Sequence, residues 1–543
     1  MAEPSNTGDT GEQSSRTSQI ATLIAALLGW MFDGFEMGLF PLIGKPAIGD
    51  LLGEGASPDD AAAWFASIIA VFLIGAATGG VVFGWLGDKI GRVRAMSLSI
   101  FTYAVFTGLC GFATEAWQIA GLRFIASLGM GGEWSLGVAL VNEIWPGKSR
   151  AFVAGLIGAA ANVGFLLVAV LSMGLTGFIE SVGGMLEAIG VSKESADSLL
   201  ANKAWRFLMI TGAVPALLIF FIRIFVPESK KWEAEKSRGA TSHWQNQELF
   251  GVLVGCLAAL AIIVVWSPML KNKEGNFPIP VAVQVGVTLI GLVIAFLGYL
   301  FPVRGYLKRS VSAGMLRQGS EGFVLKRMVL GAALASVALL GTWGSLQWAP
   351  RWASKLADDA AKKVQASVDL AVSGSETPAE APKVAAAPHF AAEKTQMATA
   401  IGAIIGTIVA AMSAEYWGRR ITYSVMCAGS MGAALLFYGT NLEFNSMFIV
   451  TAFIAGGVTA SFYGFFPLYF PELFPTAVRA TGQGFSFNFG RIVAAVGGLQ
   501  TSNLESYFGG DFAKAGSALS VIYLIGVAIV WLGPETKNAA VPD

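Results

Sequence analysis

The sequence predicts an all-α integral membrane protein with two similar six-helix halves and two extra helices between them. Three observations predict it: a composition with 54% hydrophobic and only 13% charged residues, many long apolar runs, and charged motifs that recur in the second half of the chain. A soluble core cannot bury that much apolar surface, so a lipid bilayer is the expected surroundings.

Apolar runs long enough to cross about 30 Å of hydrocarbon, at about 1.5 Å per residue, number about fourteen. They lie near residues 20–42, 61–86, 94–113, 117–144, 152–178, 205–226, 249–267, 279–301, 326–349, 396–414, 420–439, 446–468, 481–502 and 516–533. An even number of crossings predicts that both termini lie on the same side of the membrane.

Basic residues gather in alternate connections, which is typical of cytoplasmic loops. The first three groups are Lys89, Arg92 and Arg94, then Lys148 and Arg150, then Lys230, Lys231, Lys236 and Arg238. This phase predicts that both termini are cytoplasmic. The connection near 350–395, rich in Ala, Pro, Ser and Lys, then falls outside, and its composition predicts a flexible or weakly helical lid.

An internal repeat divides the chain, because two charged motifs recur with nearly the same offset. The recurring residues are Asp88, Gly91 and Arg92 with Glu415, Gly418 and Arg419, and then Glu143, Pro146 and Arg150 with Glu472, Pro475 and Arg479. The predicted units are a cytoplasmic tail (1–19), a first half (20–226), a cytoplasmic linker carrying the two extra helices (227–323), a second half that includes the outer loop 350–395 (324–534), and a second cytoplasmic tail (535–543).

The segment from Gly84 to Arg94, Gly-Trp-Leu-Gly-Asp-Lys-Ile-Gly-Arg-Val-Arg, resembles the signature loop of the major facilitator superfamily. Within it, the strings Gly29-Trp-Met-Phe-Asp-Gly-Phe-Glu36, Gly131-Gly-Glu-Trp134 and Asn488-Phe-Gly-Arg491 resemble the sialate and metabolite:proton symporters, some of which have fourteen helices. The resemblance implies proton-coupled uptake of a carboxylate, such as a sialic acid, a sugar acid or a small monocarboxylate, across a bacterial inner membrane. The second signature loop, Ala414 to Arg420, departs from the family pattern because it is shorter and has Glu in place of Asp.

Charges inside apolar runs are functional candidates, because hydrocarbon tolerates them only beside a cavity or a partner. Asp33 and Glu36 share one face of the first helix, and Arg123 in the fourth helix lies at a similar depth, so a buried arginine–carboxylate contact is possible. An anion that takes Arg123 from its carboxylate would leave that carboxylate to accept a proton, which links the two uptakes. We expect Asp33, rather than Glu36, to be that acid; a static salt bridge is the alternative.

Three more residues near the middle of the membrane are candidates. Glu133 lies further inward on the fourth helix and is either a second relay acid or a glutamate bonded to a neighbouring helix. Arg491 lies near the midplane with Asn488 one turn away on the same face, so the pair is a candidate carboxylate site, with internal pairing of Arg491 as the alternative.

Trp343 and Gln347 share a face of the ninth predicted helix and are candidates for an apolar wall and an amide donor of a binding site. The alternative is a set of tryptophans at the membrane interface, and the next two, Trp348 and Trp352, are expected to lie in such a belt.

The repeated charges at the cytoplasmic helix ends do not reach a central substrate. They are Asp88, Arg92, Glu143, Arg150, Glu415, Arg419, Glu472 and Arg479. In the family such charges form an ion-pair cluster that holds the outward-facing state, so the resemblance implies a cytoplasmic gate. Orientation of the chain by the basic residues alone is the alternative.

Other functions find little support in the sequence. The three cysteines lie in apolar runs, His243 and His389 lie in opposite loops, and no phosphate-binding loop or catalytic triad is present. We therefore expect that the protein is not an enzyme and has no cofactor, metal site or nucleic-acid partner. We expect it to be a monomer that binds an anionic substrate and protons. A uniporter or antiporter on the same fold, and a sensor that does not transport, remain alternatives.

Overall fold

The computed structural model describes residues 16–53, 55, 57–144, 150–217, 222, 228, 248–270, 278–312, 314, 316–373, 390–475 and 478–537. Over these ranges the backbone forms helices and turns and no strand. The predicted all-α class is confirmed.

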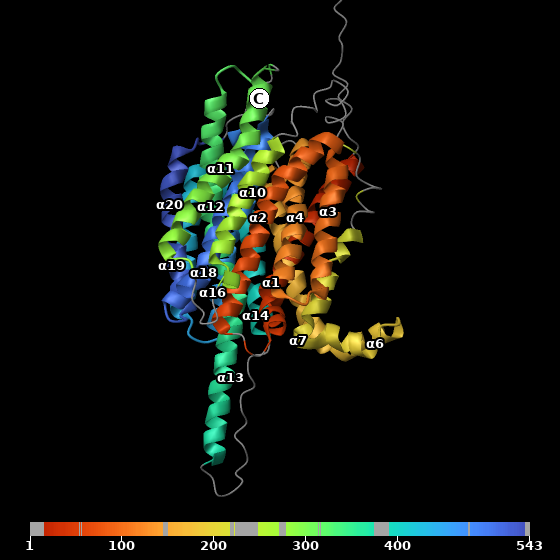
Figure 1. Cartoon of the computed structure of the whole chain (residues 1–543). Helices are drawn as coiled ribbons and strands as arrows, with labels where there is room; N and C mark the ends of the chain where they lie inside the picture. The colour runs from red at the N-terminus through yellow and green to blue at the C-terminus, as the bar shows by residue number, and fades with distance from the viewer. Residues whose placement is uncertain are drawn as a thin grey trace, which may run out of the picture.

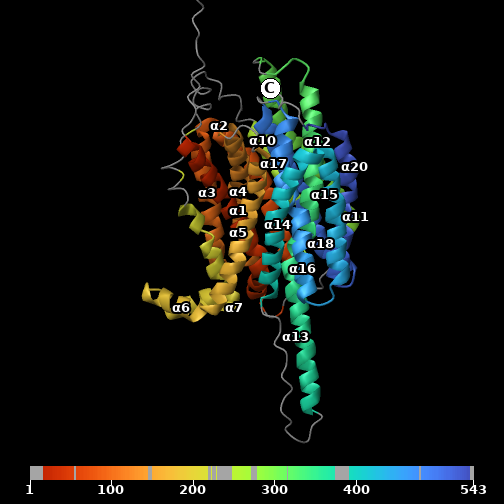
Figure 2. The same ribbon diagram turned by 180° about the vertical axis from the view of Figure 1, so that it is seen from behind.

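The first group of helices comes from the N-terminal part of the chain and forms one side of the bundle (Figures 1 and 2). Its members are α1 (Arg16–Leu52), α2 (Pro58–Ile90), α3 (Arg92–Leu109), α4 (Ala116–Ile144), α5 (Arg150–Gly177), α6 (Ile179–Ala188) and α7 (Lys193–Thr211). Within it, α4 packs on α2 and α3, and α5 packs on α1.

The second group forms the other side of the bundle and comes from the C-terminal part of the chain (Figure 2). Its members are α12 (Glu321–Gly344), α13 (Ala349–Ser373), α14 (Ala391–Trp417), α15 (Arg419–Thr440), α16 (Ser446–Ala460), α17 (Phe462–Leu473), α18 (Arg479–Tyr507), α19 (Phe512–Ser520) and α20 (Ile522–Ile529). The two groups meet where α2 packs on α18 and α5 packs on α14.

Two further helices, α10 (Glu248–Trp266) and α11 (Val281–Ser312), pack on each other and lie against both groups. The Tyr299 hydroxyl of α11 is hydrogen-bonded to Thr78 of α2. On the other side, the ring of Phe296 lies 5.1 Å from that of Phe489 in α18. The extra pair therefore contacts the same two helices at which the groups meet.

Eleven described segments are long and apolar enough to cross a membrane. Beside them, α4 and α18 also pass through the bundle, and each packs on α2. The protein is therefore an integral membrane protein. The count of fourteen crossings stays a prediction, because much of the chain between 217 and 248 lies outside the described residues.

The described part of residues 350–395, expected to form a flexible or weakly helical lid, is more helical than expected. Residues 349–373 form the continuous helix α13, which projects from the end of the bundle opposite the C-terminus (Figure 1), and α14 begins before the predicted start at 396. The alanine-rich sequence of α13 favours helix because alanine loses no side-chain entropy there. At its root, Arg351 and Lys355 pair with Glu505 of α18 at 2.9 and 3.2 Å. The start of α13 is thus firmly attached to the bundle.

A second difference is the hairpin of α6 and the first part of α7, which the apolar-run count did not predict. Its helices are short and carry several charges, so no run of membrane length marks them. α7 contains a kink at residues 201–204, where Asn202, Lys203 and Ala204 have positive φ. Beyond the kink, the side chain of Trp205 is buried in the bundle.

Candidate functional site: a cavity between the two helix groups

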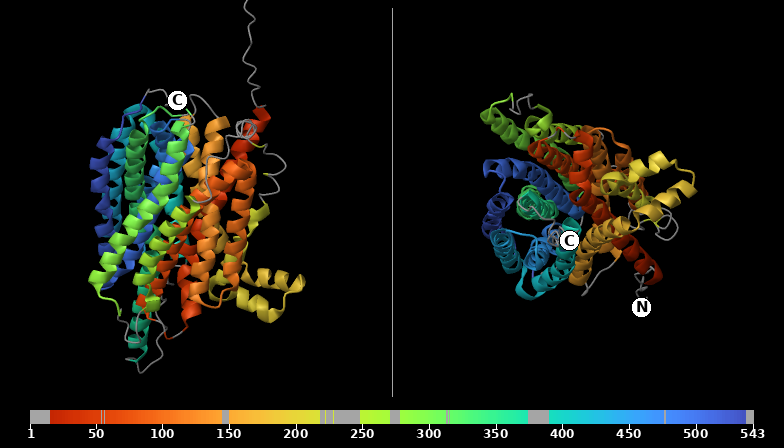
Figure 3. Two further views of the ribbon diagram at one scale, coloured as in Figure 1. Left: turned by 45° about the horizontal axis from the view of Figure 1, so that its top comes forward. Right: turned by 90° about the horizontal axis from the view of Figure 1, so that it is seen from below.

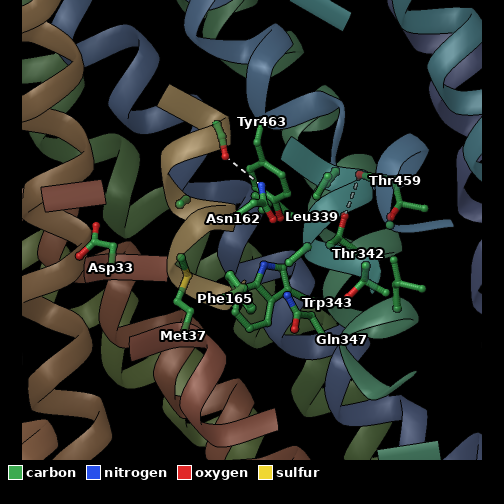
Figure 4. Close-up of a pocket in the computed structure, with 18 of the residues that line it drawn as sticks. Asp33, Met37, Asn162, Phe165, Leu339, Thr342, Trp343, Gln347, Thr459 and Tyr463 are labelled. Carbon is green, nitrogen blue, oxygen red and sulfur yellow. Dashed lines mark hydrogen bonds between the residues drawn. The ribbon is translucent and has the colours of Figure 1, made fainter. Parts of the chain in front are cut away.

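A cavity of about 1210 Å³, including its opening to solvent, lies between the two groups. Its main polar lining residues are Asp33, Asn162, Thr342, Gln347, Gln396, Thr399, Thr459, Tyr463 and Arg491. Its larger apolar lining residues are Trp30, Met37, Phe72, Phe165, Trp343, Phe466 and Phe487. Figure 4 shows Asp33 and Met37 on one side of the pocket, and Trp343, Gln347 and Thr342 on the other.

The end of helix α12 places two of the predicted site residues, Trp343 and Gln347, at this cavity. The helix ends at Gly344, and a 3-10 turn follows at Leu346–Trp348. Trp343 and Gln347 both line the cavity, and the Trp343 ring lies 6.1 Å from that of Phe72 on α2, across the interface between the groups. Trp343 and Gln347 thus lie on a cavity wall, which is where the sequence predicted them.

Trp348 and Trp352 do not form the expected interfacial belt. Both side chains are buried, and Trp352 packs on the rings of Phe437 and Phe448 at 5.2 and 5.1 Å. α13 continues past them as a helix that is fixed to the bundle, so these rings face protein instead of the membrane boundary.

Arg491 lies near the centre of α18 and lines the cavity, although only 8% of its surface is exposed. Its Nη1 donates hydrogen bonds to Asn488 Oδ1 at 3.0 Å and to the carbonyl of Ala76 at 3.3 Å, and its guanidinium lies 4.8 Å from the Phe487 ring. Among the described residues, no carboxylate forms an ion pair with it. A buried guanidinium of this kind has the capacity to hold an anion.

Asn488 lies behind Arg491 and does not line the cavity. Its side chain fits against Gly80 of α2, where a Cβ atom would overlap the amide group. The glycine therefore permits the close approach of α2 and α18. Asn488 therefore orients the guanidinium of Arg491. It does not line the cavity, so it does not have the direct contact with a ligand that was expected of it.

The carboxyl groups of Asp33 and Glu133 lie close enough to form a hydrogen bond if one of them carries a proton. Both side chains are buried, at 4% and 2% exposure, and only Asp33 lines the cavity. Gly29 makes room for Glu133, because a Cβ at this position would collide with its carboxyl group. Since two carboxylates cannot donate to each other, a hydrogen bond between them requires one shared proton.

Arg123 pairs with Glu36 and not with the preferred Asp33. Its Nη1 lies 3.1 Å from Glu36 Oε1, close enough for an ion pair although the alignment is not that of a hydrogen bond. The Thr107 hydroxyl donates to the same carboxylate oxygen at 3.0 Å, and the guanidinium lies 5.0 Å from the Phe40 ring. Both charged side chains are buried and neither lines the cavity, which agrees with the alternative of a salt bridge within the first group.

Three of the repeated charges of the second group, Glu415, Arg419 and Glu472, assemble at one end of that group. Arg419 makes a two-point contact with Glu472 at 2.7 and 3.0 Å, and Glu415 lies 3.2 Å from the same guanidinium. Arg479 donates to the carbonyl of Pro471 at 3.0 Å. Within the part of the chain that the structure describes, the bonds around Arg419 join α14, α15 and α17 of one group.

The first copy of this cluster is described only in part. The side chains of Asp88, Glu143 and Arg150 lie outside the described residues, whereas Arg92 is half-buried at the start of α3. Whether the acids and arginines of this copy pair with each other stays a prediction.

Glu228 and Glu535 occupy equivalent places that the sequence analysis missed. Glu228 accepts a hydrogen bond from the backbone N–H of Val93 at 3.1 Å, and Glu535 accepts from those of Arg419 and Arg420 at 2.9 and 3.1 Å. Each therefore satisfies unpaired N–H groups at a helix start, those of α3 and α15. The repeated strings Pro227-Glu228-Ser229-Lys230 and Pro534-Glu535-Thr536-Lys537 were the signal that could have revealed them.

Burial raises the pKa of Glu535, but the hydrogen bonds from the N–H groups of Arg419, Lys537 and Arg420, together with the charge of Arg419, outweigh it. The net result is a pKa below the ordinary value for glutamate.

Residues 21–354 match the Major Facilitator Superfamily. A protein of Haemophilus influenzae, provisionally named a metabolite transport protein, is 25% identical over 95% of this chain and 97% of its own length. The sialic acid transporter NanX of Escherichia coli is 30% identical over 40% of this chain and 46% of its own length. The cis,cis-muconate transport protein of Acinetobacter baylyi is 23% identical over 83% and 81%.

Among solved structures, the proton:xylose symporter XylE bound to 6-bromo-6-deoxy-D-glucose has a similar fold. The TM-score is 0.60, with 16% sequence identity over 96% of this chain and 98% of that one. The likeness extends to both helix groups.

Proposed function

Because the chain belongs to the Major Facilitator Superfamily and is a membrane transporter of metabolites, we propose that it couples the uptake of a small organic anion to that of a proton. Arg491 holds the carboxylate of the substrate in the central cavity, and the Asp33–Glu133 pair carries the proton. The observation that supports this proposal is a buried, cavity-lining guanidinium without a described carboxylate partner.

The coupling follows from the balance of charge in a region of low dielectric constant. Arg491 carries one positive charge, and a carboxyl pair that shares one proton carries one negative charge, so the empty site is neutral. A bound carboxylate adds a second negative charge, whose burial is costly unless a proton accompanies it. When Asp33 and Glu133 are both protonated, the loaded site is neutral again. One anion then enters with one proton.

Asp33 is the acid in this pair that meets the substrate region, since it lines the cavity and Glu133 does not. The charges of Asp33 and Arg491 are close enough to influence each other. A bound anion would neutralise the positive charge of Arg491, which otherwise stabilises the ionised form of Asp33. Protonation of Asp33 then becomes more favourable. Arg123 and Glu36 form an ion pair with no net charge, and this pair takes no part in the exchange.

The cavity wall favours a small carboxylate whose body makes both apolar and polar contacts. The rings of Phe72 and Trp343 form part of one wall, while Asn162, Gln347 and Gln396 offer a few polar contacts. The amide of Gln396 already donates to the carbonyl groups of Gly38 and Phe165 at 3.2 and 3.0 Å, which leaves its oxygen as an acceptor. Sialic acid and cis,cis-muconate, which appear in the names of two relatives, are both carboxylates and belong among the first compounds to test.

The test is uptake of radiolabelled carboxylates into proteoliposomes, with an acidic exterior and with equal pH on both sides. The panel contains sialic acid, a sugar acid, aliphatic and aromatic monocarboxylates, cis,cis-muconate, and xylose as a neutral control. Wild type is compared with Asp33→Asn and with Asp197→Asn, a matched change at an exposed position outside the cavity.

We expect accumulation of one carboxylate class that requires the acid exterior, is lost in Asp33→Asn and is kept in Asp197→Asn. Equilibration without accumulation in wild type would indicate a uniporter, and uptake that depends on a compound inside the liposome would indicate an antiporter. If no carboxylate binds or moves, the role of Arg491 as an anion site is wrong.

A further inference from the structure

The hairpin formed by α6 and the first part of α7 projects sideways from the bundle (Figures 1 and 3). It lies at the end of the bundle opposite the C-terminus, and α6 runs across the direction of α3 and α4 (Figure 1). Only Phe178 separates the end of α5 at Gly177 from the start of α6, so the hairpin begins at the level where α5 reaches the end of the bundle.

α6 has three distinct faces. Phe178, Met185 and Ile189 are 67%, 58% and 73% exposed, and their spacing of seven and four residues places them on one side of the helix. Glu180 and Glu187 are exposed on the opposite side. Between them, the side chain of Leu186 is buried. The exposed apolar side chains are thus separated from both the charges and the packed face.

The exposed apolar stripe continues the outer surface of α5. Leu167 and Leu171 of α5 are 41% and 36% exposed, and Phe178 follows them at helical spacing. These α5 side chains face the surroundings of a membrane-crossing helix, which are lipid acyl chains. The apolar stripe of α6 therefore adjoins a surface that already contacts lipid.

The hairpin is held at a fixed angle by a polar cluster around Asp50, at the end of α1. The side chains of Asn202 and Trp205 donate to its carboxylate at 2.6 and 3.0 Å, and Arg206 lies 3.3 Å away. Arg206 also donates to the carbonyl of Ala113 at 2.6 Å. The cluster surrounds the kink of residues 201–204, so the three left-handed residues there are stabilised by contacts with the bundle.

We propose that α6 lies in the plane of the membrane at the bilayer boundary, with Phe178, Met185 and Ile189 inserted among the lipid acyl chains and Glu180 and Glu187 facing water. Amphipathic helices bind the interface in this way, by burial of an apolar face below the headgroups. The lipid surface that fits is an uncharged or zwitterionic one, because the charges of the hairpin are mostly acidic and anionic headgroups would repel them. This proposal does not depend on the transported substrate.

The test places a nitroxide label on single introduced cysteines in the full-length protein, reconstituted in phosphatidylcholine liposomes. The labelled variants are Met185→Cys and Ile189→Cys on the apolar side, and Glu180→Cys and Glu187→Cys on the acidic side. Leu167→Cys on α5 is the lipid reference, and Lys362→Cys, exposed on α13, is the water reference. The native Cys110, Cys256 and Cys427 are buried, and unmodified protein measures their background labelling.

Accessibility to dissolved oxygen, which concentrates in lipid, is compared with accessibility to a water-soluble nickel chelate. At positions 185 and 189 we expect a nickel-to-oxygen ratio several-fold lower than at 180 and 187, and close to that at 167. Ratios at 185 and 189 equal to those at 187 and 362 would overturn the proposal. Shielding from both reagents that increases with the protein-to-lipid ratio would also overturn it, because a second copy of the chain would then cover the stripe.

Discussion

The carboxyl groups of Asp33 and Glu133 lie close enough to share a proton, yet only Asp33 lines the cavity. A proton that reaches Asp33 from the cavity therefore has a second acceptor directly behind it. Under the proposed proton coupling, Asp33 would be the acid that meets the substrate, and Glu133 would be the acid that passes the proton onward.

Glu133→Gln should preserve much of the contact with Asp33 while it removes the second titrating group. Because relay of a proton through a positioned acid typically contributes about a hundredfold or more, we expect a loss of that order in acid-driven accumulation. Exchange of labelled for unlabelled substrate at equal pH, which needs no net proton movement, should continue. If exchange and accumulation fall together, Glu133 has a structural role and is not a relay.

Arg491→Lys should weaken substrate binding more than it slows translocation. Lysine keeps the charge but loses the planar two-point geometry, and a charge-assisted hydrogen bond contributes about 1.5–3 kcal/mol. We expect a rise in KM of about ten- to a hundredfold for the transported carboxylate. Arg327→Lys is the matched control, since Arg327 donates to the carbonyl of Leu473 at 2.8 Å and does not line the cavity. A KM unchanged by Arg491→Lys would contradict the carboxylate assignment.

The Glu36–Arg123 pair makes a prediction about stability. Removal of one partner leaves the other charge buried and unpaired, which costs about 3–5 kcal/mol. Glu36→Gln and Arg123→Gln should each lower the free energy of unfolding by roughly this amount, measured by denaturant titration in detergent micelles. The double variant should lose less than the sum of the two, because no lone charge remains. Additive losses would indicate that the two side chains do not act as a pair.

The lowered pKa of Glu535 predicts a pH-dependent contribution to stability. A carboxylate whose pKa is depressed on folding stabilises the folded state above its unfolded pKa, about 4.5, and this contribution is lost as pH falls through the folded value. We expect Glu535→Gln to have a lower melting temperature than wild type at pH 7, with the difference shrinking below about pH 4.5. Glu321→Gln, at the start of α12, controls for the change of charge. A difference that stays constant from pH 7 to pH 4 would exclude ionisation as the cause.

Much of the architecture was predictable from the sequence. The long apolar runs identify the membrane helices, and Trp343, Gln347 and Arg491 do line the cavity between the groups. The prediction failed for α6, because a short helix with several charges has no run of membrane length. It failed for Trp348 and Trp352 because an aromatic side chain near a helix end fits both a membrane interface and a protein core.

By itself, the sequence determined the class of the protein and the few charges that matter. The reason is energetic: hydrocarbon disfavours charges so strongly that Asp33, Glu36, Arg123, Glu133 and Arg491 stand out without any structure. The tertiary structure alone decided how they pair. Asp33 and Glu36 are three residues apart, and this spacing turns their side chains by about 60° around the helix. Within the first group, one acid therefore faces Glu133 and the cavity while the other faces Arg123, and only the packing of α1 against its neighbours fixes which is which.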